Sequence, residues 1–373
     1  MEVESHFQTK QTNKNKIYHI ICNKGQISRQ ELVYEVKLSL PTVVQSIVEL
    51  MEEGLIYESG SQGNTGGRRA KIYSASPRAR VSIGIDITRN HISLVVVDIL
   101  GEIILHKRIR YSFSMETTYF KKLGLLVDES VKELSLTQKQ ILGVGIGVPG
   151  LITEDCQTVY YGTILNFTGI TCQTFNKFIP YPCRLFNDAN AGGFAESKLN
   201  KEITSAFYIS LANNVGGSIL INNKIFKGES SRSGEIGHMT IIPEGRPCYC
   251  GQKGCWEAYC AASILAEHTN GNLEEFFRLL EEKDESCVKE WKTYLEYLVI
   301  GVNNIRMLFG CKVILGGYVG AYMEKYIDKV RKMAIERNPF ENDADYLLVC
   351  KYKTEAIATG AALPFVEDFV NSI

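Results

Sequence analysis

The residues with the most chemical potential lie in one short stretch of the sequence. His238 is followed by Cys248, Cys250 and Cys255, with glycines between the last two cysteines. Three thiolates and an imidazole are a donor set that Zn²⁺ takes in closed, tetrahedral, structural sites. The glycines allow the tight loop that such a site needs. The alternative, a set of buried free thiols, does not explain why these cysteines crowd into so polar a loop. The sequence therefore predicts one structural Zn²⁺ per chain.

Two carboxylates bracket this cluster. Glu235 lies just before His238, and Glu257 lies just after Cys255. A loop held by a metal ion would fix both side chains in space. Fixed carboxylates are suited to holding a polar ligand, so we expect a ligand site beside the metal.

Composition limits the classes of protein to consider. The chain has 373 residues, 45% of them hydrophobic and 22% charged, a formal net charge of −1 and 11 cysteines. This length suggests two or three domains, and the charge gives no global attraction to nucleic acid. No apolar run is long enough to cross a membrane, and the polar N-terminus lacks the apolar core of a signal peptide. Reduced thiols and a cytoplasmic location are expected.

Residues 1–77 have the pattern of a small DNA-binding domain. Three short helices are expected, near 14–23, near 29–36 and after Ser39, where Ser39 is the N-cap and a proline occupies the first turn. Ser28 and Glu31 form a capping-box signature for the second helix. Two strands follow, joined by a glycine-rich turn over 59–69. This order predicts a winged helix-turn-helix, followed by a linker at 77–80.

The third helix and the turn supply the candidate DNA contacts. The helix would enter the major groove, and the turn would lie along the phosphate backbone or in the minor groove. The alternative for this region is a small helical protein-interaction module. Because the region is only mildly basic, we expect useful affinity only from a homodimer on a roughly palindromic operator. The candidate contacts are Ser39, Thr42, Gln45, Ser46, Arg68 and Arg69.

The larger body begins with three strands, over 81–87, 91–98 and 101–110, in a meander that is typical of the sugar-kinase and actin type of fold. A later strand, beginning at Cys183, runs into a helix at Asn187 and Asp188. The carboxyl end of a strand is where α/β folds bind ligands. Asp188 could act as a general base on a hydroxyl group, or it could simply cap the helix. The local pattern leaves both roles open.

The turns that would hold a nucleotide are largely altered. Backbone N–H groups approach phosphates most closely in glycine-rich turns, but Arg89 and Asn90 follow Asp86, and Asn213 and Asn214 stand at the second turn. The glycine pair at 316–317 after a third strand is intact. Since phosphoryl transfer depends on positioning around the phosphates, these changes predict that the chain is not an enzyme.

Four motifs give the body a family resemblance. They are GVGIGVPG at 143–150, FNDANAG at 186–192, SGEIGHM at 233–239 and CYCGQKGCWE at 248–257. Together they resemble the ROK family of repressors, open reading frames and sugar kinases. With a helix-turn-helix in front, the chain looks like the repressor branch, and in particular like xylose repressors. The resemblance implies an α/β two-lobed, actin-like (ribonuclease H-like) body over 78–373. Lobe one would span 81–190 plus the C-terminal helix, and lobe two 191–350.

The resemblance also implies roles for single residues. His238, Cys248, Cys250 and Cys255 match the family's zinc ligands, and Asp188 matches the catalytic base of its kinases. His238 could bind zinc through one ring nitrogen and donate from the other. The positions that match sugar-hydroxyl contacts are Asn166, Asn187, Asp188, Glu235, His238 and Glu257.

These observations predict a sugar-responsive transcriptional regulator, most simply a repressor that a monosaccharide releases from its operator. With both phosphate turns altered, Asp188 is expected to be a vestigial base that accepts hydrogen bonds from sugar hydroxyls. One alternative is an ATP-dependent sugar kinase with a DNA-binding appendage. Another is a regulator that answers to a partner protein; the set of sugar-type polar groups argues against it, because such groups are costly to bury without a ligand.

Overall fold

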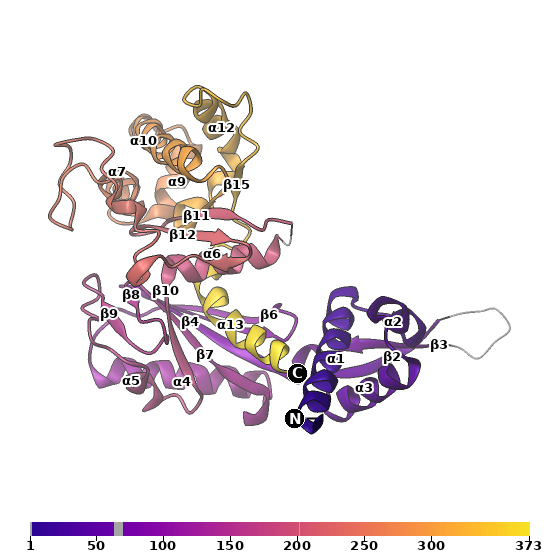
Figure 1. The fold of residues 1–373 in the computed structure, drawn as a ribbon. Helices are drawn as coiled ribbons and strands as arrows, with labels where there is room; N and C mark the ends of the chain where they lie inside the picture. Colours follow the sequence, from indigo (N-terminus) through magenta and orange to yellow (C-terminus); the bar gives the residue numbers. More distant parts are fainter. Residues whose placement is uncertain (1, 63–69, 201) are drawn as a thin grey trace.

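The computed structural model describes residues 2–62, 70–200 and 202–373. Figure 1 shows an N-terminal body beside a lower lobe, and an upper lobe above the lower one. Helix α6 (Asp188–Leu199) lies between the two lobes, and helix α13 (Ala356–Ser372) runs from their junction toward the N-terminal body. Within the described ranges, no helix is both long and apolar enough to cross a membrane.

The N-terminal body consists of three helices and an antiparallel sheet in the order β1–β3–β2. Its first helix starts well before the predicted residue 14, whereas the predicted caps of the other two are present. Ser28 and Glu31 form the capping box of α2, and the Ser39 hydroxyl accepts a hydrogen bond from the Thr42 N–H at 3.4 Å. The elements are α1 (Glu2–Lys24), β1 (Ile27–Ser28), α2 (Arg29–Val36), α3 (Leu40–Glu52), β2 (Ile56–Gln62) and β3 (Ala70–Ala75).

Two expectations for this body need correction. The turn was expected to begin at residue 59, but β2 continues to Gln62, which pairs with Ala70. Ser46 was predicted to contact DNA, but it is only 4% exposed and lies on the inner face of α3 beside Ile47. Its hydroxyl therefore cannot reach a groove. Arg68 and Arg69 lie outside the described residues.

The segment predicted as a linker is held firmly. The Pro77 carbonyl accepts a hydrogen bond from the Ile99 N–H at 3.1 Å, and the Arg78 carbonyl accepts one from the Gln140 amide at 2.8 Å. One apolar cluster continues through this junction. It joins Ile17, Tyr18 and Ile21 of α1 to Val95 and Val97 of the lower lobe and to Ala358, Ala362 and Val366 of α13. The N-terminal body is thus packed onto the rest of the chain.

The two lobes carry five-stranded sheets with the same topology. In each, the first three strands form an antiparallel meander, and the fourth and fifth strands lie parallel beside the first. The order is β10–β7–β4–β5–β6 in lobe one and β15–β14–β11–β12–β13 in lobe two. The strands are β4 (Val81–Ile87), β5 (His91–Asp98), β6 (Ile103–Arg110), β7 (Ile141–Val148), β10 (Cys183–Asn187), β11 (Ala206–Leu211), β12 (Val215–Ile221), β13 (Lys224–Ile225), β14 (Lys312–Gly316) and β15 (Leu347–Val349).

Helices and one small hairpin complete the lobes. In lobe one, α4 and α5 cover the sheet, and β8 pairs with β9. In lobe two, α9, α10 and α12 enclose a large core that contains Trp256 and Trp291. The remaining elements are α4 (Thr117–Glu133), β8 (Leu151–Ile152), β9 (Val159–Tyr161), α5 (Cys172–Asn176), α7 (Glu257–Cys260), α8 (Ala262–Ala266), α9 (Leu273–Glu281), α10 (Glu285–Phe309), α11 (Gly317–Gly320) and α12 (Ile327–Ile335).

The glycines of the motif at 143–150 serve packing. A Cβ atom on Gly145 would lie 1.9 Å from the Ala361 carbonyl oxygen of α13, and one on Gly84 would lie 1.8 Å from that of Ala358. On α13 itself, a Cβ on Gly360 would lie 1.7 Å from the Ala191 carbonyl oxygen of α6. Backbone meets backbone here, so neither side can yield. Glycine is therefore required where α13 crosses the sheet and α6.

We expect Gly145→Ala to destabilise the protein by at least about 3 kcal/mol, because a methyl group at this crossing forces α13 off the sheet. The measurement is the free energy of unfolding in urea, followed by tryptophan fluorescence. Gly271→Ala is the control: its surroundings are open and only its left-handed backbone (φ +86°) is strained, at a cost of about 1 kcal/mol. Equal losses for both variants would contradict the packing role.

Candidate functional site

The four predicted metal ligands converge on one point. The ligand atoms of His238, Cys248, Cys250 and Cys255 all lie within 4.8 Å of one another. Cys250 Sγ is 3.7 Å from Cys255 Sγ, and Cys248 Sγ is 3.8 Å from His238 Nδ1. Zn–S bonds of about 2.3 Å in a tetrahedron place sulfur atoms about 3.8 Å apart. The donors and their spacing therefore fit a tetrahedral zinc ion.

The loop geometry explains the spacing of these ligands. The Gly251 N–H donates to the Cys248 carbonyl at 3.0 Å, which closes a tight turn with Gly251 in the left-handed region. A bridge between Thr240 and Cys255 then brings the end of the loop back to its start. His238 lies just before that bridge, so the turn and the bridge together bring the imidazole to the three sulfurs.

The two ring nitrogens of His238 face different partners. Nδ1 faces the sulfur cluster, and Nε2 lies 3.3 Å from the Tyr249 hydroxyl. Both His238 and Tyr249 line the adjacent cavity. The geometry suits an imidazole that binds a metal through one nitrogen and meets a polar group through the other.

A cavity of about 250 Å³ lies beside the metal cluster, between the two lobes. Lobe one contributes the loop after β7 and the segment 161–164, and lobe two contributes the turn between β11 and β12 and the loop that carries His238. Its lining residues are Pro149, Gly150, Leu151, Tyr161, Gly162, Thr163, Ile164, Asn187, Asp188, Ala189, Ser210, Asn214, Val215, Gly216, Gly217, Arg232, Glu235, His238, Tyr249 and Cys250.

Four of the six residues predicted to contact a sugar line this cavity. They are Asn187, Asp188, Glu235 and His238. Asn166 does not line it; this residue is exposed and has a left-handed backbone (φ 53°) in the loop that follows the lining residues 163–164. Glu257 also lies outside the lining, as described next.

Glu257 is buried just behind the cavity and holds one of its walls. One carboxylate oxygen accepts from the Asn214 amide at 3.0 Å and the other from the Val215 N–H at 2.6 Å. Burial and the charges of Asp188 and Glu235 raise the pKa of Glu257 to about 7. In this arrangement Glu257 fixes the turn between β11 and β12, and it reaches the cavity only through that turn.

The structure separates the two roles that the sequence left open for Asp188. The cap of α6 is Asn187, whose Oδ1 accepts from the Asn190 N–H at 2.9 Å. Asp188 is the first helical residue, and one of its oxygens accepts from the Ala189 N–H at 2.8 Å. Its carboxyl group faces the cavity, where burial and the charge of Glu235 raise its pKa to about 6. Asp188 is therefore free to accept hydrogen bonds from a ligand.

Sequence reasoning missed several cavity residues. Arg232 stands next to the motif at 233–239, and that position is the only signal that could have pointed to it. Tyr161 and Thr163 carried no signal, because the β8–β9 hairpin brings them to the cavity from a segment without a motif.

Side chains of the two lobes meet beside the altered first phosphate turn. Tyr318 of lobe two reaches the Thr88 side chain of lobe one, and the Arg108 guanidinium lies over the Tyr318 ring at 5.6 Å. The intact glycines at 316–317 serve another purpose, since the Gly317 N–H donates to the Tyr208 hydroxyl at 3.2 Å. Burial, together with the charge of Asp188, raises the pKa of Asp86 to about 8. Asp86 is thus largely protonated at neutral pH and poorly suited to hold a metal–phosphate group.

Comparison with known proteins agrees with this architecture. The ROK family model matches residues 82–367, so the chain belongs to the ROK family. It is 27% identical to the xylose repressor of Caldicellulosiruptor bescii over 98% of both chains, and 29% identical to that of Bacillus spizizenii over 84% of both.

Two solved structures show the same fold. One is a ROK family transcriptional regulator, a homologue of the E. coli MLC protein, with a TM-score of 0.76 and 20% identity over 98% of this chain and 97% of that one. The other is a ROK family glucokinase from Streptomyces griseus in complex with glucose and AMPPNP, with a TM-score of 0.64 and 21% identity over 76% of this chain and 98% of that one.

We expect purified, unchelated protein to contain one equivalent of zinc, and Cys250→Ser to contain almost none, because removing a thiolate opens the tetrahedral set. The variant should also unfold at a lower temperature, since the metal contributes folding free energy. Metal content is measured by atomic absorption, and unfolding by calorimetry. Cys311→Ser, a half-buried thiol outside the cluster, is the matched control. A full equivalent of zinc in Cys250→Ser would exclude this assignment.

Proposed function

We propose that this protein is a sugar-responsive repressor, stabilised by Zn²⁺, that leaves its operator DNA when a monosaccharide binds between its lobes. The observation that carries the proposal is the cavity beside the metal cluster, which keeps its polar side chains although both phosphate turns are altered. The relatives named xylose repressor match over 84% to 98% of this chain and support the same interpretation. A xylose-like sugar is the proposed ligand class.

The N-terminal body is proposed to be a winged helix-turn-helix. The α3 helix would enter the major groove, with exposed Gln45 and half-buried Thr42 facing the bases and Ser39 near the phosphates. Arg68 and Arg69, in the turn between β2 and β3, are proposed phosphate or minor-groove contacts. A single body of this size offers few phosphate contacts, so a homodimer on a roughly palindromic operator is proposed.

The sugar is proposed to bind among Asn187, Asp188, Glu235 and His238. Their amide, carboxylate and imidazole groups offer both acceptors and donors, as an array of hydroxyl groups requires. Asn166 and Glu257 are proposed to contact the sugar as well once the lobes close. Each Glu257 oxygen keeps a second lone pair beyond the bond that it now accepts.

A continuous set of contacts links this cavity to the N-terminal body. Asp188 begins α6, and α6 crosses α13 at the contact between Ala191 and Gly360. At the far end of α13, the Val370 carbonyl accepts from the Asn15 amide of α1 at 2.6 Å, and the Ser372 carbonyl accepts from that of Gln11 at 2.7 Å. Lobe closure that moves α6 would therefore reorient the N-terminal body. The sugar shifts this balance only by its differential affinity for the two states.

All eleven cysteines are unpaired, which supports a reducing, cytoplasmic location for the proposed regulator. The kinase alternative rests on the retained Asp188. It is disfavoured because positioning around the phosphates is almost the whole of phosphoryl-transfer catalysis, and both phosphate turns are altered.

We expect the protein to bind DNA upstream of its own or neighbouring genes, and D-xylose or a related pentose to weaken that binding at fixed salt. Fluorescence anisotropy measures both. Gln45→Ala should weaken specific binding about tenfold by removing a base contact, whereas Glu52→Ala, exposed at the other end of α3, should not weaken it. Specific binding that no monosaccharide alters would refute release by a sugar, and ADP release that depends on Asp188 would favour the kinase.

Sugar affinity should depend on pH through Asp188. Its ionised form accepts hydrogen bonds from hydroxyl groups, and its pKa in the free protein is raised to about 6. Affinity is therefore expected to be present above pH 6 and to fall as pH drops through this value, by about tenfold between pH 7 and pH 5. Calorimetric titration measures it, with zinc content checked at each pH. Asp188→Asn should bind weakly at every pH; an unchanged affinity of the native protein at pH 5 would speak against the role of Asp188.

A further inference from the structure

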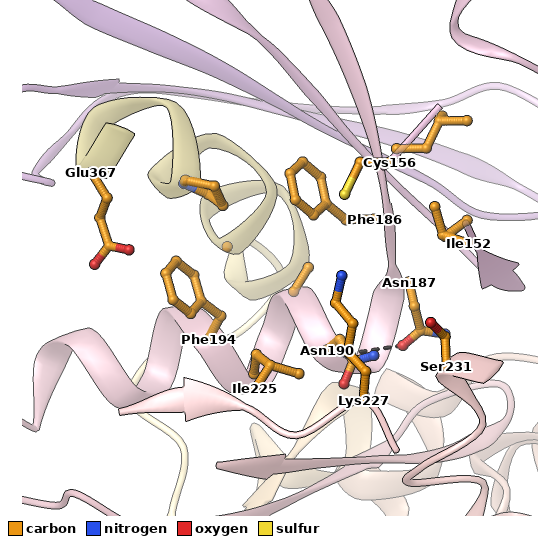
Figure 2. A pocket seen from close by; sticks show the side chains of 14 residues that line it. Ile152, Cys156, Phe186, Asn187, Asn190, Phe194, Ile225, Lys227, Ser231 and Glu367 are labelled. Atoms are coloured by element: carbon orange, nitrogen blue, oxygen red, sulfur yellow. Dashed lines mark hydrogen bonds between the residues drawn. The ribbon is translucent and has the colours of Figure 1, made fainter. Parts of the chain in front are cut away.

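A second cavity, also of about 250 Å³, lies between α6 and α13. Figure 2 shows it from close by, with Phe194 and Asn190 rising from α6 and Lys227 entering from below. Asn187 lines both this cavity and the one beside the metal cluster. The lining residues are Ile152, Cys156, Leu185, Phe186, Asn187, Asn190, Ala191, Phe194, Ile225, Lys227, Ser231, Gly360, Pro364 and Glu367.

Most of the lining is apolar, which distinguishes this cavity from its polar neighbour. Two aromatic rings, Phe186 and Phe194, stand among aliphatic side chains and Pro364. Such a surface accepts an aromatic or aliphatic group and excludes a sugar, whose hydroxyl groups would lose their water without gaining partners. An apolar cavity of about 150 Å³ is enough to hold benzene. This one therefore has room for a single ring with a short side arm.

Two polar groups in the lining lack partners. The Asn190 Oδ1 atom is fully buried and accepts no hydrogen bond within the described part of the chain. Lys227 forms no ion pair with any described residue, and Figure 2 shows its ammonium group directed toward Phe186. The acidic residue of the lining, Glu367, lies away from Lys227 and is paired with Lys198. The ammonium group of the exposed Lys227 thus stands at an apolar cavity without an ion-pair partner among the described residues.

We propose that this cavity is a second ligand site, which takes a small aromatic carboxylate. The ring lies between Phe186 and Phe194, and the carboxylate meets the Lys227 ammonium. A hydroxyl or amine on the ligand would also satisfy Asn190. Charge complementarity selects an acid over a neutral or cationic analogue, and the apolar lining selects a ring over a sugar acid.

The position of the cavity gives the ligand a regulatory effect, and this part rests on the proposed function. A ring between α6 and α13 braces these two helices against each other, and they connect the sugar cavity to the N-terminal body. Because α6 starts at Asp188, occupancy of one cavity changes the affinity of the other, and by linkage the effect is reciprocal. The protein would then integrate two signals, a sugar and an aromatic acid.

The test uses 3-phenylpropionate and its neutral amide on the full-length protein, by calorimetry and ligand-observed NMR, without DNA. We expect saturable binding of the acid at one site per chain. Lys227→Gln should weaken binding of the acid about tenfold, to the affinity of the neutral amide. The same substitution should leave the affinity of the amide unchanged. Lys224 of β13 is exposed, as Lys227 is, but lies outside the lining, so Lys224→Gln should bind like the native protein. Ile225→Trp, which fills the cavity, should abolish binding.

The outcomes separate this proposal from the proposed function. The proposed site would be overturned if the acid shows no saturable binding. It would also be overturned if the native protein, Lys227→Gln and Ile225→Trp all bind the acid equally. Binding of the acid without any change in D-xylose affinity at saturation would keep the site and overturn its regulatory effect. If D-xylose itself does not bind, the sugar proposal fails, while the acid titration still decides the second site.

Discussion

The close contact of α13 with the backbone of both lobes is the constraint on which the rest of the structure depends. Gly84 and Gly145 allow the helix to lie directly on the lower sheet, and Gly360 allows it to touch α6. A contact without intervening side chains has no soft layer to absorb a displacement. Movement of α6 must therefore be transmitted to α13, whose far end is packed against α1.

Asp188, which lines the cavity between the lobes, lies near two further buried acidic groups, Asp86 and Glu257. Burial raises the pKa values of Asp86, Asp188 and Glu257, and the charge of Asp188 adds to the shift of the other two. A family of kinases would use some of these groups around a nucleotide and its metal ions. In this chain, Asp188 faces the cavity beside the zinc-type cluster, and Glu257 lies behind one wall of that cavity. The altered turns and the retained polar cavity are the basis for the proposal that this chain binds a sugar without phosphoryl transfer.

The parts of this picture that the sequence predicted are local in the chain. The metal cluster follows from four donor residues in one loop, and the caps at Ser28 and Ser39 follow from side-chain chemistry within one turn of helix. Ser46 was misjudged from its polar side chain, although its helical spacing to Val43, Ile47 and Leu50 places it on the buried face of α3. Tyr318, Arg232 and the second cavity depend on segments far apart in sequence that only the tertiary structure brings together. The glycines of 143–150 were recognisable as a motif, but their partner helix lies at the other end of the chain.

The exchange of helices between the lobes has a consequence for biosynthesis. The α6 helix follows the last strand of lobe one and packs on β11 and β12 of lobe two, while α13 follows the last strand of lobe two and packs on β4 and β7 of lobe one. N-terminal domains commonly fold first during synthesis. In this chain, the apolar cluster that anchors α1 includes Ala358, Ala362 and Val366 of α13, so it stays incomplete until α13 has been synthesised. A chain that ends before α13 therefore leaves the N-terminal body without this part of its anchor.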